Sequence, residues 1–164
     1  MTERIDWRSL AERSGTLREK GEIGGAEYGR RAIEVLLGEE NMRAAVDYYI
    51  SGEAGSELAR DVLKTVRPWS AMKRCYEIYG ADGEIVRRRL AVELLRAVAD
   101  ERAVVWVGEF LEDTDDEIQM WGAGILEQLA DEGRVAVEDV GELLEKARHH
   151  ANPAVREIAL GISL

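Results

Sequence analysis

The chain has 164 residues, of which 46% are hydrophobic and 34% are charged, and its formal net charge is −11. These values fit one ordinary globular domain rather than a disordered chain, and the acidic balance disfavours direct contact with nucleic-acid phosphates. The charged start MTERIDWRSL has no signal-peptide core, no apolar run is long enough for a membrane span, and Cys75 is the single cysteine. We therefore expect a cytoplasmic protein with one domain, residues 1–164.

Helix start and stop signals divide the chain into ten helical segments. Asn152 followed by Pro153 is a typical helix start, and Thr114 with Glu117 matches a capping box. The expected helices are 4–14, 26–37, 41–50, 56–66, 69–79, 84–99, 102–111, 115–130, 137–149 and 153–163. No strand is predicted, because the only short run that could alternate, AVVWVGEF, is interpreted as a buried helix.

The helices repeat as hairpins. At four corners an apolar or small residue ends one helix and an aliphatic residue follows eight positions later, with 28, 32 and 37 residues between successive corners. The pairs are Ile50 and Leu58, Ile78 and Val86, Phe110 and Ile118, and Ala147 and Val155. A helical hairpin of this kind cannot bury its apolar face alone, so the repeats are expected to stack on one another.

Three segments carry a family resemblance. NPAVREIALG from Asn152 resembles the second helix of a HEAT repeat, and ADGEIVRRRLAVELL from Ala81 and TDDEIQMWGAGILEQLAD from Thr114 are similar, with Gln119 in place of the usual Arg. The resemblance implies an all-α fold, a short right-handed α-solenoid of about five stacked hairpins. The glycine-rich EKGEIGGAEYG departs from a standard corner, so residues 1–40 are expected to form a divergent N-terminal capping hairpin.

The segment from Glu109 to Glu145 holds 13 acidic residues and a single basic one, Arg134. A calcium loop counted from Asp113 is excluded, because its twelfth residue is Gly124 rather than a bidentate Glu. Two interpretations of the acidic segment stay open, namely solubility alone and long-range attraction of a basic partner.

The resemblance implies that second helices line a concave binding surface. With the acidic corner, this gives a set of candidate protein-binding residues: Glu112, Asp113, Asp115, Asp116, Gln119, Met120, Trp121, Glu127, Gln128, Asp131 and Arg88. Trp121 has two interpretations, an anchor for a partner or a core side chain between repeats. Trp121 and Arg89 fall at the same repeat position, so the guanidinium of Arg89 can stack on the indole if the two helices are neighbours.

No catalytic, cofactor-binding or metal-binding residues are predicted. Adjacent helical residues such as His149 and His150 point about 100° apart, which is poor geometry for sharing one metal. No nucleophile motif accompanies Cys75, and no phosphate-binding glycine loop is present in the sequence. A catalytic group assembled in space from distant residues is not excluded by the sequence.

The leading hypothesis is a non-enzymatic protein-interaction module whose acidic surface binds a basic protein, in the manner of an immunity protein or inhibitor that neutralises a nuclease-like toxin. The alternatives are a HEAT-like nucleic-acid-processing enzyme, similar to a glycosylase, and a structural subunit of a larger assembly. The apolar C-terminal segment ALGISL predicts homodimerisation or docking through that end. No cofactor, nucleic acid or membrane is expected as a partner.

Overall fold

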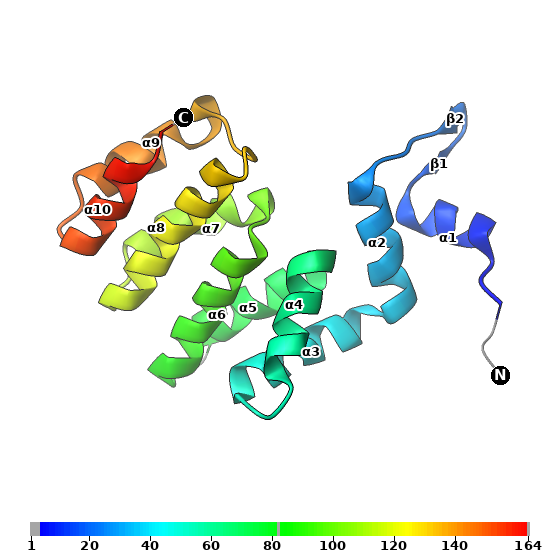
Figure 1. Ribbon diagram of the computed structural model, residues 1–164, viewed down its shortest axis with the longest axis horizontal. Coiled ribbons are helices and arrows are strands. Elements are labelled where there is room, and N and C mark those ends of the chain that lie inside the picture. Colours follow the sequence, from blue (N-terminus) through cyan, green and yellow to red (C-terminus); the bar gives the residue numbers. More distant parts are fainter. Residues whose placement is uncertain (1–3, 82, 164) are drawn as a thin grey trace. The chain divides into compact units, whose positions relative to one another are not determined.

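The computed structural model of the protein describes residues 4–81 and 83–163, and these residues are predominantly helical (Figure 1). The α-helices are α1 (Trp7–Ser14), α2 (Ala26–Leu37), α3 (Glu39–Ser51), α4 (Ser56–Val66), α5 (Trp69–Ala81), α6 (Ile85–Val98), α7 (Val104–Leu111), α8 (Asp116–Asp131), α9 (Val137–Arg148) and α10 (Pro153–Gly161). A short 3-10 helix, η1 (Glu101–Ala103), precedes α7. The expected all-α class is confirmed. None of the described helices is both long and apolar enough to cross a membrane.

Of the two helix starts named from the sequence, the one at Asn152 is confirmed and the one at Thr114 is wrong. The side chain of Asn152 accepts a hydrogen bond from the amide of Ala154, and Pro153 occupies the first helical position of α10. The start of α8 differs from the expected Thr114 cap, because Asp115 is the N-cap and accepts hydrogen bonds from the amides of Glu117 and Ile118. A carboxylate at this position also suits the positive end of the helix dipole.

The prediction that the chain contains no strand is wrong at one place. Leu17–Arg18 (β1) and Gly21–Glu22 (β2) form a short antiparallel ribbon in which Leu17 pairs with Glu22. Strands of two residues are too short to produce a visible alternation of apolar and polar positions, so the pattern gave no signal for them.

The chain divides into two compact units, residues 1–71 and 72–164, and the boundary lies inside α5. The expectation of a single domain over residues 1–164 stays a prediction. The N-terminal unit contains α1, the ribbon, α2, α3, α4 and the start of α5. Its buried apolar residues lie mainly on α3 and α4: Met42, Val46, Ile50, Leu63 and Val66. No residue of α2 is fully buried. The expected capping hairpin, 1–40, covers α1, the ribbon and α2, and its capping role also stays a prediction.

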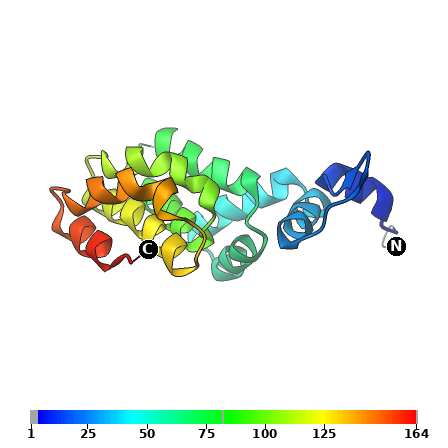
Figure 2. The same cartoon turned by 90° about the horizontal axis from the view of Figure 1, so that it is seen from above.

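The C-terminal unit is built around α8. This helix contacts α6 on one side and α10 on the other, and α7 contacts both α8 and α9 (Figure 1). Seen from above, α7 and α9 lie in one layer and α8 and α10 in a second layer (Figure 2). The space between the layers is filled by large, fully buried side chains: Phe110, Leu94, Leu95, Leu111, Ile118, Ile125, Leu126 and Leu129. This core fixes which residues at the ends of α6 and α8 meet.

Candidate functional site

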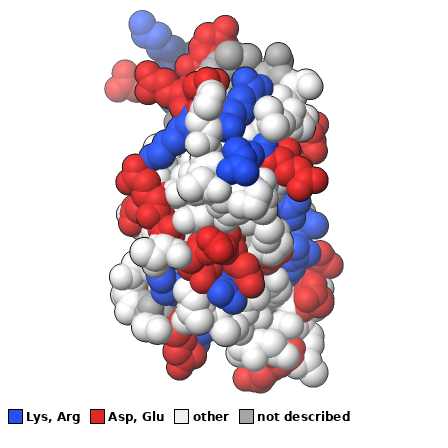
Figure 3. Space-filling view, turned by 90° about the vertical axis from the view of Figure 1, so that its left-hand side faces the viewer, with Lys and Arg blue, Asp and Glu red and all other residues white. Residues whose placement is uncertain are grey.

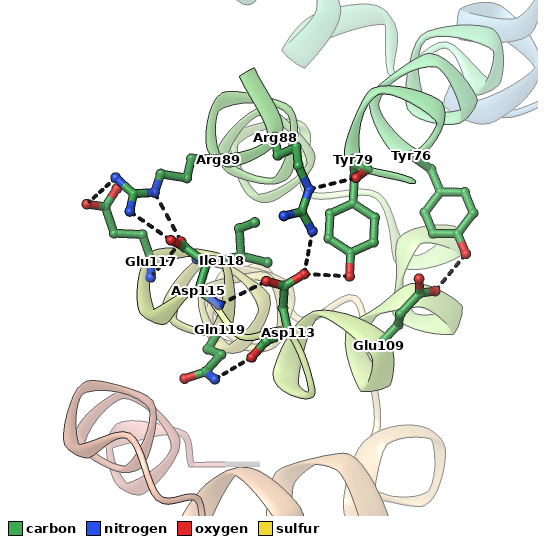
Figure 4. A network of polar contacts seen from close by, with 10 residues as sticks. All are labelled: Tyr76, Tyr79, Arg88, Arg89, Glu109, Asp113, Asp115, Glu117, Ile118 and Gln119. Atoms are coloured by element: carbon green, nitrogen blue, oxygen red, sulfur yellow. Dashed lines mark hydrogen bonds and ion pairs between the residues drawn. The ribbon is translucent and has the colours of Figure 1, made fainter. Parts of the chain in front are cut away.

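Asp113, from the predicted acidic surface, lies inside the C-terminal unit rather than on it. One of its carboxylate oxygens accepts hydrogen bonds from Nη2 of Arg88 at 2.6 Å and from the hydroxyl of Tyr79 at 3.0 Å (Figure 4). Only 6% of the Asp113 side chain is exposed. Nε of Arg88 also donates to the carbonyl oxygen of Tyr79 at 2.9 Å. Burial and the hydrogen bond to Asp113 raise the pKa of Tyr79 above its ordinary value.

Asp115 is engaged in a second internal ion pair. Its carboxylate accepts two hydrogen bonds from Arg89, at 3.0 Å from Nε and 2.7 Å from Nη2, in addition to the amides it caps (Figure 4). The side chain is 14% exposed. The hydrogen bond from Arg89, together with the capped amides, lowers the pKa of the Asp115 carboxyl. Arg89 reaches Glu117 as well, at 3.1 Å.

Gln119 continues this set of contacts toward α10. Its side-chain nitrogen donates to the carbonyl oxygen of Asp113 at 2.6 Å, and its side-chain oxygen accepts from Nδ2 of Asn152 at 3.0 Å. We call the connected residues the corner network: Tyr79, Arg88, Arg89, Asp113, Asp115 and Gln119. The corner network joins the end of α5, the start of α6 and the start of α8. Four of the predicted binding residues therefore make internal contacts.

A different group of residues lies together on α6 and α8, and we call it the α8 platform: the half-exposed Arg96, Trp121 and Glu127, and the buried Gly124. The guanidinium carbon of Arg96 lies 5.4 Å from the centre of the Trp121 ring, and Nη2 lies 3.6 Å from Glu127. The prediction that Arg89 stacks on Trp121 is therefore wrong, because Arg96 takes that position. Trp121 itself is half-buried, so it is neither a fully enclosed core residue nor a fully exposed anchor.

Gly124 makes room for the Arg96 side chain. A Cβ atom at this glycine would lie 2.8 Å from Cδ and Nε of Arg96, closer than packed atoms approach. Gly122 plays a similar part on the opposite side of α8, where its Cβ would lie 2.8 Å from Cβ of Phe110. The two glycines allow α8 to approach α6 and α7 closely.

The remaining predicted residues lie on the surface or near it. Glu112 is exposed and pairs with Lys146, which lowers the pKa of the Glu112 carboxyl. Met120 is half-buried, and Nε2 of Gln128 donates to Glu132 at 3.0 Å. Asp116 and Asp131 are exposed.

Within the acidic segment from Glu109 to Glu145, five exposed residues have a carboxylate that makes no ion pair or hydrogen bond with another described residue: Asp116, Asp131, Glu138, Asp139 and Glu142. Four of them follow one another along the end of α8 and the first turns of α9. We call these four the α9 carboxylates: Asp131, Glu138, Asp139 and Glu142. The last three were not among the predicted site residues, although they lie within the acidic segment. The spacing of Glu138 and Glu142 could have identified them from the sequence, because residues four positions apart share one face of a helix.

The histidines do not form a shared site. Nδ1 of His150 accepts from the amide of Asn152 at 3.0 Å, and its Nε2 lies 2.8 Å from the carbonyl oxygen of Leu111. This pattern requires the tautomer with hydrogen on Nε2. His149 follows the last residue of α9, and its Nδ1 lies 3.3 Å from a carboxylate oxygen of Glu145 in that helix. Within residues 4–81 and 83–163, no group of three or more His, Cys, Asp or Glu side chains is arranged to hold a metal ion.

Comparison of the chain with protein-family models, with curated proteins and with solved structures gives no match.

Proposed function

We propose that the protein is a non-enzymatic protein-interaction module, a short HEAT-like solenoid that binds a basic protein in the cytoplasm. The observation that carries the proposal is the division of the acids in the C-terminal unit into two groups. Asp113 and Asp115 are neutralised inside the corner network, whereas the α9 carboxylates are exposed and have no cationic partner among the described residues.

Charge supports the same proposal. Residues 72–164 contain 11 Lys and Arg against 20 Asp and Glu, a net charge of −9. Carboxylates that are already paired add little to the outward field, whereas unpaired and exposed carboxylates attract a cationic surface and speed its approach. We therefore place the contact on the α9 carboxylates rather than on Asp113 and Asp115.

The distribution of charge limits the size of the proposed contact. On the face seen in Figure 3, acidic and basic side chains are interspersed in small clusters, several of which contain both charges, and uncharged surface lies between the clusters. The proposed contact is therefore local: a partner meets the α9 carboxylates at the end of α8 and in the first turns of α9, and Trp121 of the α8 platform adds an aromatic anchor. An immunity protein or inhibitor that covers the phosphate-binding surface of a nuclease-like toxin fits these requirements.

The decisive experiment removes the four α9 carboxylates without disturbing the fold. Asp131→Asn, Glu138→Gln, Asp139→Asn and Glu142→Gln are combined in one variant. The wild type and this variant are used as baits for affinity capture from the native cell, with identification by mass spectrometry. We expect a basic protein that is retained by the wild type, lost from the variant, and associates more slowly as salt is raised.

A matched control separates local recognition from net charge. Glu19→Gln, Glu22→Gln, Glu53→Gln and Glu57→Gln remove the same number of charges from exposed positions of the N-terminal unit. This control should retain the partner. If both variants lose it equally, only overall charge matters. If neither loses it, the acidic residues serve solubility and the proposal is wrong.

A further inference from the structure

Helix α2 presents an apolar stripe to solvent. Ile33, Leu36 and Leu37 are 42%, 49% and 42% exposed, and Gly29 extends the stripe toward the start of the helix. These positions recur at helical spacing, so they share one face. A contiguous apolar face of this kind on a small protein usually marks an interaction surface.

Other faces of α2 contact neighbouring elements of the N-terminal unit. Tyr28 and Ala32 line a hollow together with residues of α1, and α1 packs along α2. On another side, the Glu34 carboxylate accepts hydrogen bonds from the amides of Trp69 and Ser70 at the start of α5, at 3.3 and 3.1 Å. The stripe borders the hollows beside α1 through Gly29 and Leu36, and the side chains of Ile33 and Leu37 stay exposed next to it.

The groove between α1 and α2 is hollowed toward both ends of α2. A cavity of about 190 Å³ lies beside Gly25 and Gly29, and a second cavity of about 390 Å³ lies beside Leu36. Leu10 lines both cavities. Apart from its chain neighbours and the nearby backbone of α2 itself, no described atom lies within 4 Å of the position that a Cβ of Gly29 would take. The glycine end of the stripe therefore has room for a large side chain.

We propose that this stripe binds the same stripe of a second copy of the chain, with the two α2 helices antiparallel. In that arrangement Leu36 and Leu37 of each copy meet the hollow beside Gly29 of the other. The same antiparallel arrangement brings Arg30 of each copy near Glu39 and Glu40 of the other.

Charge complementarity favours a second copy over an unrelated partner. Arg30 makes no ion pair with another described residue, whereas Arg31 already pairs with Glu27. Glu39 and Glu40 are exposed at the start of α3. One end of α2 therefore has a cation, Arg30, and the hollow beside Gly29. The other end has large side chains, Leu36 and Leu37, and leads to the anions of α3. A surface of this kind is complementary to itself under a twofold rotation.

The first test measures association by sedimentation velocity over a range of protein concentrations. We expect a concentration-dependent dimer in the wild type. Ile33→Glu should raise the dimer dissociation constant about tenfold or more, because it places a charge in an apolar contact. Leu58→Glu is a matched control on α4, since Leu58 is 70% exposed outside the stripe.

The second test uses charge reversal. Arg30→Glu alone, and Glu39→Lys with Glu40→Lys, should each weaken self-association, because like charges then face one another. A mixture of the two variants should associate again, since each supplies the charge that the other lacks. If these charged residues acted only within their own chain, mixing the two variants would not restore association. Circular dichroism melting of each variant verifies that the fold is retained.

Specific outcomes would overturn the proposal. A wild type that remains monomeric up to its solubility limit excludes the dimer. Leu160 is 69% exposed near the C-terminus, so Leu160→Glu tests the alternative interface. Dissociation by Leu160→Glu but not by Ile33→Glu would assign the dimer to the C-terminal end. Failure of the mixed variants to associate would exclude the antiparallel arrangement.

Discussion

Asp115 combines two roles that are separable by substitution. It caps α8 through two amides, and it holds Arg89 through two further hydrogen bonds. Asparagine can keep the cap, because its side-chain oxygen also accepts from backbone amides, but it has no charge for Arg89. Alanine removes both functions.

We expect Asp115→Asn to lower the free energy of unfolding by about 1–2 kcal/mol, because a charge-assisted pair is lost. Asp115→Ala should lower it by about 1 kcal/mol more, through loss of the cap. Urea denaturation of the three proteins at neutral pH measures both steps. Equal stability of the Asn and Ala variants would show that the cap contributes nothing.

The same residue predicts a pH dependence. The pKa of Asp115 is lowered in the folded protein, chiefly by the hydrogen bond from Arg89. Its stabilising contribution is therefore complete above the unfolded pKa, which is about 3.9, and is lost as the pH falls through the folded pKa. Acidification should narrow the stability gap between the wild type and Asp115→Asn, and a constant gap would contradict this assignment.

The sequence indicates what kind of contact a side chain makes more readily than it indicates which residue is the partner in that contact. A cation beside Trp121 was predicted correctly, but Arg89 was predicted as that cation because the two residues share a repeat position. In the structure Arg89 is held by Asp115 and Glu117, and Arg96 reaches the indole through the space left by Gly124. That choice depends on how α6 and α8 pack, which sequence spacing does not specify.

At the scale of the element, helix ranges could be predicted well. Local signals such as Asn152 with Pro153 act within one turn, so neighbouring residues alone determine where α10 begins. The ribbon of Leu17–Arg18 and Gly21–Glu22 was not found, because its strands are too short to carry a pattern. The close approaches of α8 were also not found, since a glycine in a helix does not indicate which neighbour it meets.

Two glycines of α8 provide a matched pair of substitutions. Gly122→Ala brings a methyl group against Cβ of the fully buried Phe110, which has no free space to move into. Gly124→Ala meets Cδ and Nε of Arg96, a flexible side chain that is 31% exposed and can swing outward. The same chemical change should therefore have opposite consequences two residues apart.

We expect Gly122→Ala to destabilise the protein by about 1–3 kcal/mol through overpacking. Gly124→Ala should preserve stability or raise it by up to about 1 kcal/mol, because alanine favours a helix, while moving Arg96 off Trp121. Thermal melting measures the first effect, and the indole Nε1 resonance of Trp121 reports the second. A Gly124→Ala protein with an unchanged indole resonance would contradict the proposed contact.

At the scale of the whole molecule, the two units differ in how completely their helices are buried. Seven residues of α8 are fully buried, whereas no residue of α2 is. Amides exchange with solvent through local opening, and the free energy of that opening follows the number of buried apolar contacts that must separate. We therefore expect α2 to open far more readily than α8.

Hydrogen exchange followed by mass spectrometry checks this expectation. In dilute protein, peptides covering residues 26–37 should exchange faster than peptides covering residues 118–129. If α2 binds a second copy, raising the protein concentration should slow exchange in α2 but not in α4, whose exposed Leu58 lies outside the stripe. Equal exchange in α2 and α8 of the dilute protein would contradict the link between burial and opening. Slowing in both α2 and α4 would indicate general association rather than pairing through the stripe.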